Sequence, residues 1–399
     1  MPGRASRAFP APIKAAHSWL QGIEFAKDTP LIDVSQAAPT DIPPFALRDA
    51  MAQFVLEEKE AHFYGPILGM ARLRYSMAAH CKEVYSADIT SDHIAITSGC
   101  NQAFCAAIAA LADEGDNVIL VAPWYFNHKM WLDMTGIETQ ALLCGTDMLP
   151  NPNTAAALVS HKTRAICLVS PNNPAGIAYP DQLLHAFFDL AESHGIALIL
   201  DETYKDFHPN AAFPHSLCAR RNAFDTLIQL FSFSKSYRLT GHRVGAIATA
   251  PKRLKEIEKF LDTVTICPSQ VGQYGAHWGL LHLSDWLADQ RAEMQKRREY
   301  LETEFSKLSD LNWKLLGAGG YFAYVEHPFP QSSDIIAQTI LKEAAILCLP
   351  GTMFAPTGVD CAHRQLRIAF ANIECEDIET LIQRLYKISL ALASPSSGK

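Results

Sequence analysis

The chain has 399 residues, of which 49% are hydrophobic and 19% charged, and its formal net charge is −8. This length exceeds what one ordinary core supports, so two domains are expected, and the composition excludes wholesale disorder. An acidic chain with scattered basic residues is a poor candidate for binding nucleic acid or an anionic membrane. The longest apolar run, Ala103–Ala112, is too short to span a bilayer.

The cysteines and the N-terminus bear on location. The ten cysteines form no C-x-x-C pair, which favours buried free thiols in a reducing compartment over disulfides or a metal site. Before Glu24 there are three Lys or Arg residues and no acid, which fits a transit peptide or, with more weight, a disordered basic tail. Without a secretory hydrophobic region, a cytoplasmic location is expected.

The middle of the chain predicts an α/β domain with a large, mostly parallel sheet flanked by helices. Its apolar runs lack clean alternation, as in strands that are buried on both faces. Amphipathic helices are expected between them, for example at Asn101–Asp113 and Pro180–His194. The expected strands are His93–Thr97, Asn117–Ala122, Arg164–Val169, Ile196–Leu200, Leu227–Phe231 and Val244–Ala248.

A smaller α+β region is expected to follow. It begins with a long charged helix near Asp285–Arg298, continues with strands at Gly320–Val325 and Gln365–Ala369, and ends with a helix at Asp377–Leu392. We therefore expect three parts: residues 1–45 as an N-terminal segment packing with the small domain, 46–285 as the large domain, and 286–399 as the small C-terminal domain.

Polar motifs follow the expected strands, at the edge where open α/β sheets bind ligands. After the first strand, Gly99 permits a tight turn, and the amides that follow lie at a helix N-terminus, which favours an anion. A plain turn is the alternative there. The aromatic segment Pro123–His128 can offer a flat face to a planar ring, with core packing equally favoured.

Three further motifs supply charge and an amine. Ser170–Gly176 is first a turn signal, but its asparagines can donate to a phenolate oxygen. Asp201 ends a buried strand, where a carboxylate needs a partner such as a pyridinium N–H, or else caps a helix. Lys235 lies among serines past another strand, and Arg243 can bind a phosphate, although a solvated loop lysine is the alternative. All five motifs occur directly after expected strands, and this combination indicates a ligand-binding site far more strongly than any one motif does.

The segments SPNNPAG, DETY and SFSKSYRLTGHRVG resemble those of the class I/II, fold-type-I pyridoxal-phosphate (PLP) aminotransferases, and the resemblance covers nearly the whole chain. It implies that Lys235 carries pyridoxal 5'-phosphate as a Schiff base and exchanges protons with the substrate. It also implies that Asp201 pairs with the pyridine nitrogen, that Asn173 and Tyr204 contact the phenolic oxygen, and that Tyr125 stacks on the ring. Lys235, Asp201 and Tyr204 are the expected catalytic residues.

The same resemblance implies further contacts. Tyr64, in YGPILGMARLR, resembles a tyrosine that reaches the phosphate of the neighbouring subunit, which implies a homodimer. Arg367, in LRIAF, resembles the arginine that binds the substrate α-carboxylate, with a strand-edge charge as the alternative. Ala37 and Asn173 are also expected at the substrate. The implied phosphate ligands are Gly99, Cys100, Asn101, Ser232, Ser234 and Arg243.

Two departures from the family pattern concern the substrate. Ala37 stands where the family usually has a glycine, so its methyl group narrows the pocket. No arginine occurs between Arg253 and Arg291, where dicarboxylate-specific members bind the distal carboxylate. A neutral, hydrophobic or aromatic amino donor and a 2-oxo-acid acceptor are therefore expected. Arg72 or Arg74 could still supply the missing cation. Trp19, Tyr125 and Tyr321 could form an aromatic pocket, with core packing equally favoured for Trp19 and Tyr321.

Other PLP functions use the same cofactor residues. A carbon–sulfur β-lyase of this fold differs from an aminotransferase in its reaction rather than in these motifs, so the sequence leaves both open. A PLP-binding transcription regulator without catalysis is a remote alternative, because the family match begins within the first 40 residues and is expected to leave no room for a DNA-binding head.

Overall fold

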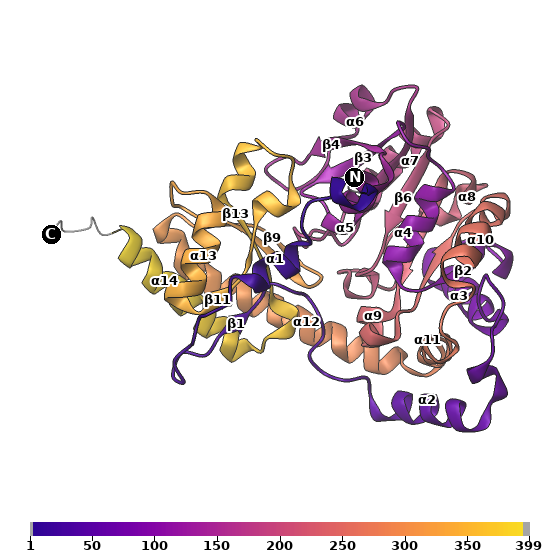
Figure 1. Cartoon of the computed structure of the whole chain (residues 1–399), viewed down its shortest axis with the longest axis horizontal. Helices are drawn as coiled ribbons and strands as arrows, with labels where there is room; N and C mark the ends of the chain where they lie inside the picture. Colours follow the sequence, from indigo (N-terminus) through magenta and orange to yellow (C-terminus); the bar gives the residue numbers. More distant parts are fainter. Residues whose placement is uncertain (1–2, 394–399) are drawn as a thin grey trace.

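The larger part of the protein, seen in a computed structural model that describes residues 3–393, is a seven-stranded sheet with the order β2-β8-β7-β6-β5-β3-β4 (Figure 1). Strand β8 runs antiparallel to β2 and β7, and the other ladders are parallel. The predicted α/β class with a mostly parallel large sheet is therefore confirmed. The strands are β2 (Ile94–Thr97), β3 (Asn117–Ala122), β4 (Glu138–Leu143), β5 (Thr163–Val169), β6 (Ala197–Asp201), β7 (Leu227–Ser232) and β8 (Gly245–Ala248).

Helices cover both faces of this sheet, which explains its continuous apolar strands. In β3, Ile119 and Val121 face a core shared with α2, α3, α7 and α11, whereas Val118 and Leu120 face a core shared with α4, α5 and α10. The helices of the chain are α1 (Pro12–Ser18), α2 (Phe45–Glu57), α3 (Ala71–Tyr85), α4 (Cys100–Ala109), α5 (Phe126–Thr135), α6 (Pro152–Leu158), α7 (Asp181–Ser193), α8 (Ala223–Thr226), α9 (Phe233–Ser236), α10 (Pro251–Thr265), α11 (Gln270–His282), α12 (Ser284–Phe305), α13 (Ser333–Ala344) and α14 (Cys375–Ala393).

A second core lies on a four-stranded antiparallel sheet with the order β12-β13-β10-β9. Helix α12 connects the two cores, since Leu287 packs in the large one and Leu301 and Phe305 pack in the second (Figure 1). The remaining strands are β1 (Ile32–Asp33), β9 (Lys314–Gly319), β10 (Phe322–Glu326), β11 (Ile346–Leu347), β12 (Leu349–Pro350) and β13 (Gln365–Ala369).

The N-terminal segment contacts both parts. Strand β1 pairs with β11, and Val34 is buried in the second core. Arg4 and Arg7, in a short 3-10 helix, form ion pairs of 2.6 and 2.8 Å with Glu114 beside the large sheet. The expectation of a disordered basic tail is thus wrong for these residues, because Glu114 gives their charges a partner. The division of the chain at residues 45 and 285 stays a prediction.

Strand β4 was not expected from the sequence. It lies at the edge of the sheet, and its residues Glu138, Thr139 and Gln140 are exposed or half-buried, so the strand lacks an apolar run. Between residues 3 and 393, no helix is long and apolar enough to cross a membrane. All ten cysteines are free thiols.

Candidate active site

A cavity of about 330 Å³ lies where the strands of the large sheet end at their carboxyl termini, and residues of β10, β13 and the N-terminal segment close it. Ligand sites of open α/β sheets lie at this edge. Twelve of the predicted site residues line the cavity: Ala37, Cys100, Asn101, Tyr125, Asn173, Asp201, Tyr204, Ser232, Ser234, Lys235, Arg243 and Arg367.

Lys235 lies on the four-residue helix α9, directly after β7. The Ser232 side chain accepts a hydrogen bond of 3.2 Å from the Ser234 amide and so caps this helix. The Lys235 amine donates to the carbonyl oxygen of Ala37 at 2.6 Å. Burial, and then the positive charges of Arg243 and Arg367, lower the pKa of Lys235 to about 8. A substantial fraction of the amine is therefore neutral, and nucleophilic, near pH 7 to 8.

Asp201 ends β6 with its carboxylate buried beside His128. One carboxylate oxygen accepts the Thr203 amide at 2.9 Å, and the other lies 3.2 Å from Nε2 of His128. Burial by itself raises the pKa of Asp201, but the contacts with His128 and Thr203 outweigh it and hold the pKa below its ordinary value. Asp201 is therefore an anion that points into the cavity and can stabilise a cationic N–H group there.

The turn before α4 forms a cradle for an anion. Gly99 precedes α4 with φ of +87°, a conformation that favours glycine, and a Cβ atom there would lie 2.2 Å from the Arg243 guanidinium. Arg243 also donates to Ser234 Oγ at 3.3 Å. Helix N-terminal amides, a hydroxyl and a guanidinium thus converge on one point, which suits a phosphate group.

Arg367 is a buried cation that contacts neutral oxygens. It is 2% exposed, lies between the rings of Phe322 and Phe354, and donates to Asn173 Oδ1 at 3.0 Å and to the carbonyl oxygen of Ser35. Among the described residues, its Nε atom has no hydrogen-bond partner. Burial lowers the pKa of Arg367 to about 10, so it remains charged at neutral pH. A buried cation without a carboxylate partner is costly, and an anionic substrate group would compensate for it.

Several predicted residues lie elsewhere. Tyr64 is 80% exposed and does not line the cavity of this single chain. Gly99 shapes the cradle through its backbone without lining the cavity. Of the three aromatic residues considered for the pocket, Tyr125 lines the cavity. The core-packing alternative holds for the other two: Trp19 packs against the second core, and Tyr321 packs against Tyr204 with its ring centre 5.9 Å from Lys235 Nζ.

Three functional residues were missed from the sequence. His128, the partner of Asp201, is the last residue of the aromatic motif and lies on α5, where its ring stacks on Phe104 at 3.9 Å. Ile13, on α1, and Phe322, on β10, add apolar surface to the cavity. The position of His128 three residues after Tyr125 is a usable signal, because this spacing places both residues in one helical turn. Ile13 reaches the cavity by long-range packing, which leaves no local pattern.

The comparisons with known proteins agree with this geometry. An aromatic aminotransferase of Arabidopsis thaliana is 26% identical over 333 residues and 81% of each chain, and an aspartate aminotransferase of Thermotoga maritima is 26% identical over 364 residues and 91% of each chain. The fold is similar to that of Pyrococcus protein-A1, with a TM-score of 0.89, 22% identity and 98% coverage of each chain. It is also similar to that of YbdL from Escherichia coli, for which a methionine aminotransferase function is identified, with a TM-score of 0.85, 22% identity and coverage of 97% and 99%. The family of class I and II aminotransferases matches residues 29–385, and the chain therefore belongs to this PLP-dependent family.

Proposed function

We propose that this aminotransferase holds PLP on Lys235, takes its amino group from a neutral, hydrophobic or aromatic amino acid, and passes it to a 2-oxo acid. The observation that carries the proposal is the Arg367 guanidinium, which lies in the same cavity as the Lys235 amine, donates only to neutral oxygens and, among the described residues, has an Nε atom without a hydrogen-bond partner. Within the described residues of this cavity, Arg367 is the one cation not assigned to the cofactor, and one such cation beside a low-pKa amine suits a monocarboxylic amino acid.

The cavity residues fit PLP. The cradle of Gly99, Ser234 and Arg243 suits its phosphate, with Cys100, Asn101 and Ser232 as the other candidate ligands. Asp201, kept ionised by His128, suits the ring nitrogen. Tyr125 would lie against the ring. Asn173 and Tyr204 would meet the phenolic oxygen.

When bound, PLP supplies an electron sink for charge that develops at the substrate Cα. Arg367 binds the α-carboxylate and thereby orients the Cα–H bond toward Lys235. The neutral Lys235 amine would take the proton from the substrate Cα and would later deliver it to the C4′ carbon of the cofactor, acting as base and then as acid. Asp201 stabilises positive charge on the ring nitrogen throughout, and burial keeps water away from the reacting atoms.

The preference for a neutral donor rests on the charges that line the cavity. Its cations, within the part of the chain that the structure describes, are Lys235, Arg243 and Arg367, and the first two are assigned to the cofactor. Ile13 and Phe322 add apolar wall. A side-chain carboxylate would have no remaining cation in this cavity and would be costly to bury.

The alternative cations are engaged elsewhere. Arg72 forms a 3.0 Å ion pair with Glu60, and Arg74 donates to the carbonyl oxygens of Ser91 and Ile94. Neither arginine lines the cavity. The relatives described above are an aromatic and an aspartate aminotransferase, and these two kinds of donor are distinguished by half-reaction kinetics.

Half-reaction kinetics test this proposal. With PLP-loaded enzyme, we expect phenylalanine and methionine to convert the cofactor to its amino form roughly tenfold faster than aspartate, since an unpaired buried carboxylate costs at least about 1.4 kcal/mol. Absorbance in single-turnover experiments measures this rate, with alanine as the small neutral control. Faster reaction with aspartate would contradict the neutral preference. Ammonia release without any need for a 2-oxo acid would instead indicate the β-lyase.

The pKa of Lys235 predicts how the unloaded protein reacts with PLP. The attacking species is the neutral amine, whose fraction rises as pH passes the pKa. The rate of covalent attachment should therefore increase with pH and level off above about 8, the pKa of Lys235, rather than near the ordinary lysine value. Stopped-flow absorbance between about pH 6 and 10 measures it, with free lysine as the reference. A rate that keeps rising to about pH 10 would contradict the lowered pKa.

We also expect a homodimer in which Tyr64 completes the neighbouring cavity. Tyr64 is exposed in the single chain, and Phe45, Leu56 and Phe63 are also exposed apolar side chains close to it in sequence. Tyr64→Phe should weaken PLP binding by about tenfold or more, the amount expected from one lost hydrogen bond to a charged group, and exposed Tyr75→Phe is the matched control. Sedimentation measures the assembly. An active monomer would contradict the shared site.

A further inference from the structure

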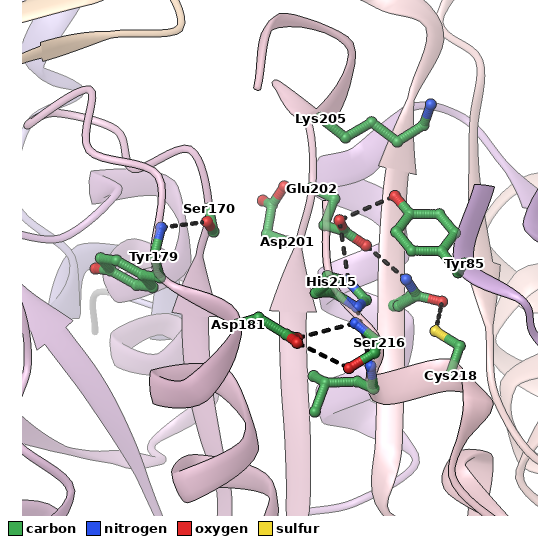
Figure 2. A network of polar contacts seen from close by, with 12 residues as sticks. Tyr85, Ser170, Tyr179, Asp181, Asp201, Glu202, Lys205, His215, Ser216 and Cys218 are labelled. Atoms are coloured by element: carbon green, nitrogen blue, oxygen red, sulfur yellow. Dashed lines mark hydrogen bonds and ion pairs between the residues drawn. The ribbon is translucent and has the colours of Figure 1, made fainter. Parts of the chain in front are cut away.

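A buried polar network lies beside Asp201, at the residue that follows it in the chain (Figure 2). Its centre is Glu202, which is 2% exposed and follows β6. Tyr85 donates to one carboxylate oxygen of Glu202 at 2.9 Å, and Gln229 donates to the other at 2.6 Å. Nε2 of His215, which is also 2% exposed, lies 3.3 Å from the first oxygen. A buried carboxylate needs several such partners to be tolerated.

The hydrogen bonds around Glu202 set which of its neighbours donate and which accept. Nδ1 of His215 accepts the Leu217 amide at 3.3 Å, and the other ring nitrogen, Nε2, lies 3.3 Å from Glu202 without forming a hydrogen bond. The Gln229 oxygen accepts the Cys218 thiol at 3.2 Å, which turns the Gln229 amide N–H group toward Glu202. Tyr85 and Gln229 thus each donate a hydrogen bond to a different oxygen of Glu202, an arrangement that suits a carboxylate.

The thiol and the phenol stay protonated as these hydrogen bonds require. Burial first, and then the Glu202 charge, raise the pKa of Tyr85 and of Cys218 well above their ordinary values. Both groups therefore remain donors at any pH at which the enzyme works.

The network joins the two strands that carry the reacting groups. Glu202 follows β6, whose last residue is Asp201, and Gln229 is on β7, which leads through Ser232 to Lys235. The Glu202 amide also donates to the carbonyl oxygen of Leu230 at 2.9 Å. Beyond Leu230 no ladder pair joins these two strands, so the Glu202–Gln229 bond lies close to the point where they separate.

We propose that Glu202 is a positioning residue of the transamination: its buried carboxylate fixes the end of β6 against β7 and so sets the placement of Asp201 relative to Lys235. The inference rests on the roles proposed above for those two residues. It differs from them because Glu202 lines no part of the cavity and acts through its neighbours. Small displacements of reacting groups carry large costs in rate.

The key variants are Glu202→Gln and the exchange Glu202→Gln/Gln229→Glu. In the single variant, the amide N–H group introduced at position 202 would face the N–H group of Gln229, so two donors would oppose each other. Rotating the Gln229 amide by 180° would relieve this but would remove the hydrogen bond that its oxygen accepts from Cys218. In the exchange, the amide introduced at position 202 would accept from Tyr85 and donate to the carboxylate introduced at position 229. That carboxylate would also accept from Cys218, so the pattern of donors and acceptors is restored. Glu304→Gln is the control, since Glu304 is a 7%-exposed carboxylate that pairs with Lys307 at the end of α12.

Full-length PLP-loaded enzyme is used for the measurements. For Glu202→Gln we expect kcat per bound PLP to fall roughly tenfold with KM changed less than about twofold, because orientation rather than substrate binding is disturbed. We expect a shift in the pH titration of the bound cofactor's absorbance and weaker PLP binding by tryptophan fluorescence. The exchange variant should recover most of each loss, and Glu304→Gln should match the wild type.

The outcomes separate the hypotheses. A Glu202→Gln enzyme with wild-type kcat and an unshifted cofactor titration, even with a lowered Tm, would show a purely structural role and overturn the proposal. So would an exchange variant that folds but stays as slow as the single variant. If Glu202→Gln does not fold, Tyr85→Phe, which removes one donor, should give smaller losses of the same kind, and unchanged kcat there would overturn it. A wild-type protein that neither binds PLP nor transaminates would refute the proposed function instead.

Discussion

Replacing Lys235 with alanine is expected to reduce kcat at least about 10³-fold, because one side chain supplies both the covalent attachment and the proton transfers. Lys235→Ala should still bind PLP, since the Gly99–Arg243 cradle and Asp201 are intact. Its bound cofactor should not remain on the protein after denaturation. Steady-state kinetics and absorbance of the denatured protein measure the two effects.

Borohydride reduction of the wild-type enzyme gives an independent check on Lys235. Mass spectrometry should find the reduced cofactor on the peptide that contains Lys235 and on no other. Lys252→Ala is the control, because Lys252 is an exposed lysine on α10 paired with Asp225, and it should retain wild-type turnover and labelling. Labelling of a different lysine, or substantial turnover in Lys235→Ala, would refute the assignment.

Replacing Asp201 with asparagine is expected to raise the activation free energy by on the order of 3 kcal/mol, which lowers kcat about a hundredfold. The asparagine side chain keeps the shape of the aspartate, and its oxygen can still accept the hydrogen bond from the backbone N–H of Thr203. The substitution removes the buried negative charge that would stabilise a cationic ring nitrogen. The effect should therefore fall on kcat, with PLP affinity changed much less.

The pH dependence sharpens this test. Because His128 and Thr203 hold the pKa of Asp201 below its ordinary value, the wild-type carboxylate is ionised throughout the neutral range. The loss in Asp201→Asn should thus be nearly constant between about pH 6 and 9. Asp334→Asn, which alters a carboxylate beside Thr352 in the smaller part of the chain, is the control and should keep wild-type kcat. Near-normal turnover in Asp201→Asn would exclude the proposed role.

The sequence by itself determined the sheet and the order of its motifs. The six expected strands coincide with β2, β3, β5, β6, β7 and β8 to within a residue at each end, because both faces of this sheet are buried and its strands are therefore continuous apolar runs. Motifs directly after such strands must meet at one edge, so Asp201 and Lys235 could be placed near each other from the sequence. The edge strand β4 was not predicted, because its partly exposed residues do not form the continuous apolar run that marked the other strands.

Only the tertiary structure decided which distant side chains meet these motifs. His128 reaches Asp201, Ile13 reaches the cavity, and Glu202 joins Tyr85 and Gln229, through packing that brings together segments far apart in the sequence. The tertiary structure also decided the partner of Arg4 and Arg7: both pair with Glu114, which lies more than a hundred residues further along the chain. The local sequence predicts whether a residue is buried, because the spacing of apolar residues shows which face of a helix or strand packs against the core. The partner of a buried polar group depends on how helices and strands far apart in sequence pack together, and the local sequence does not encode that packing.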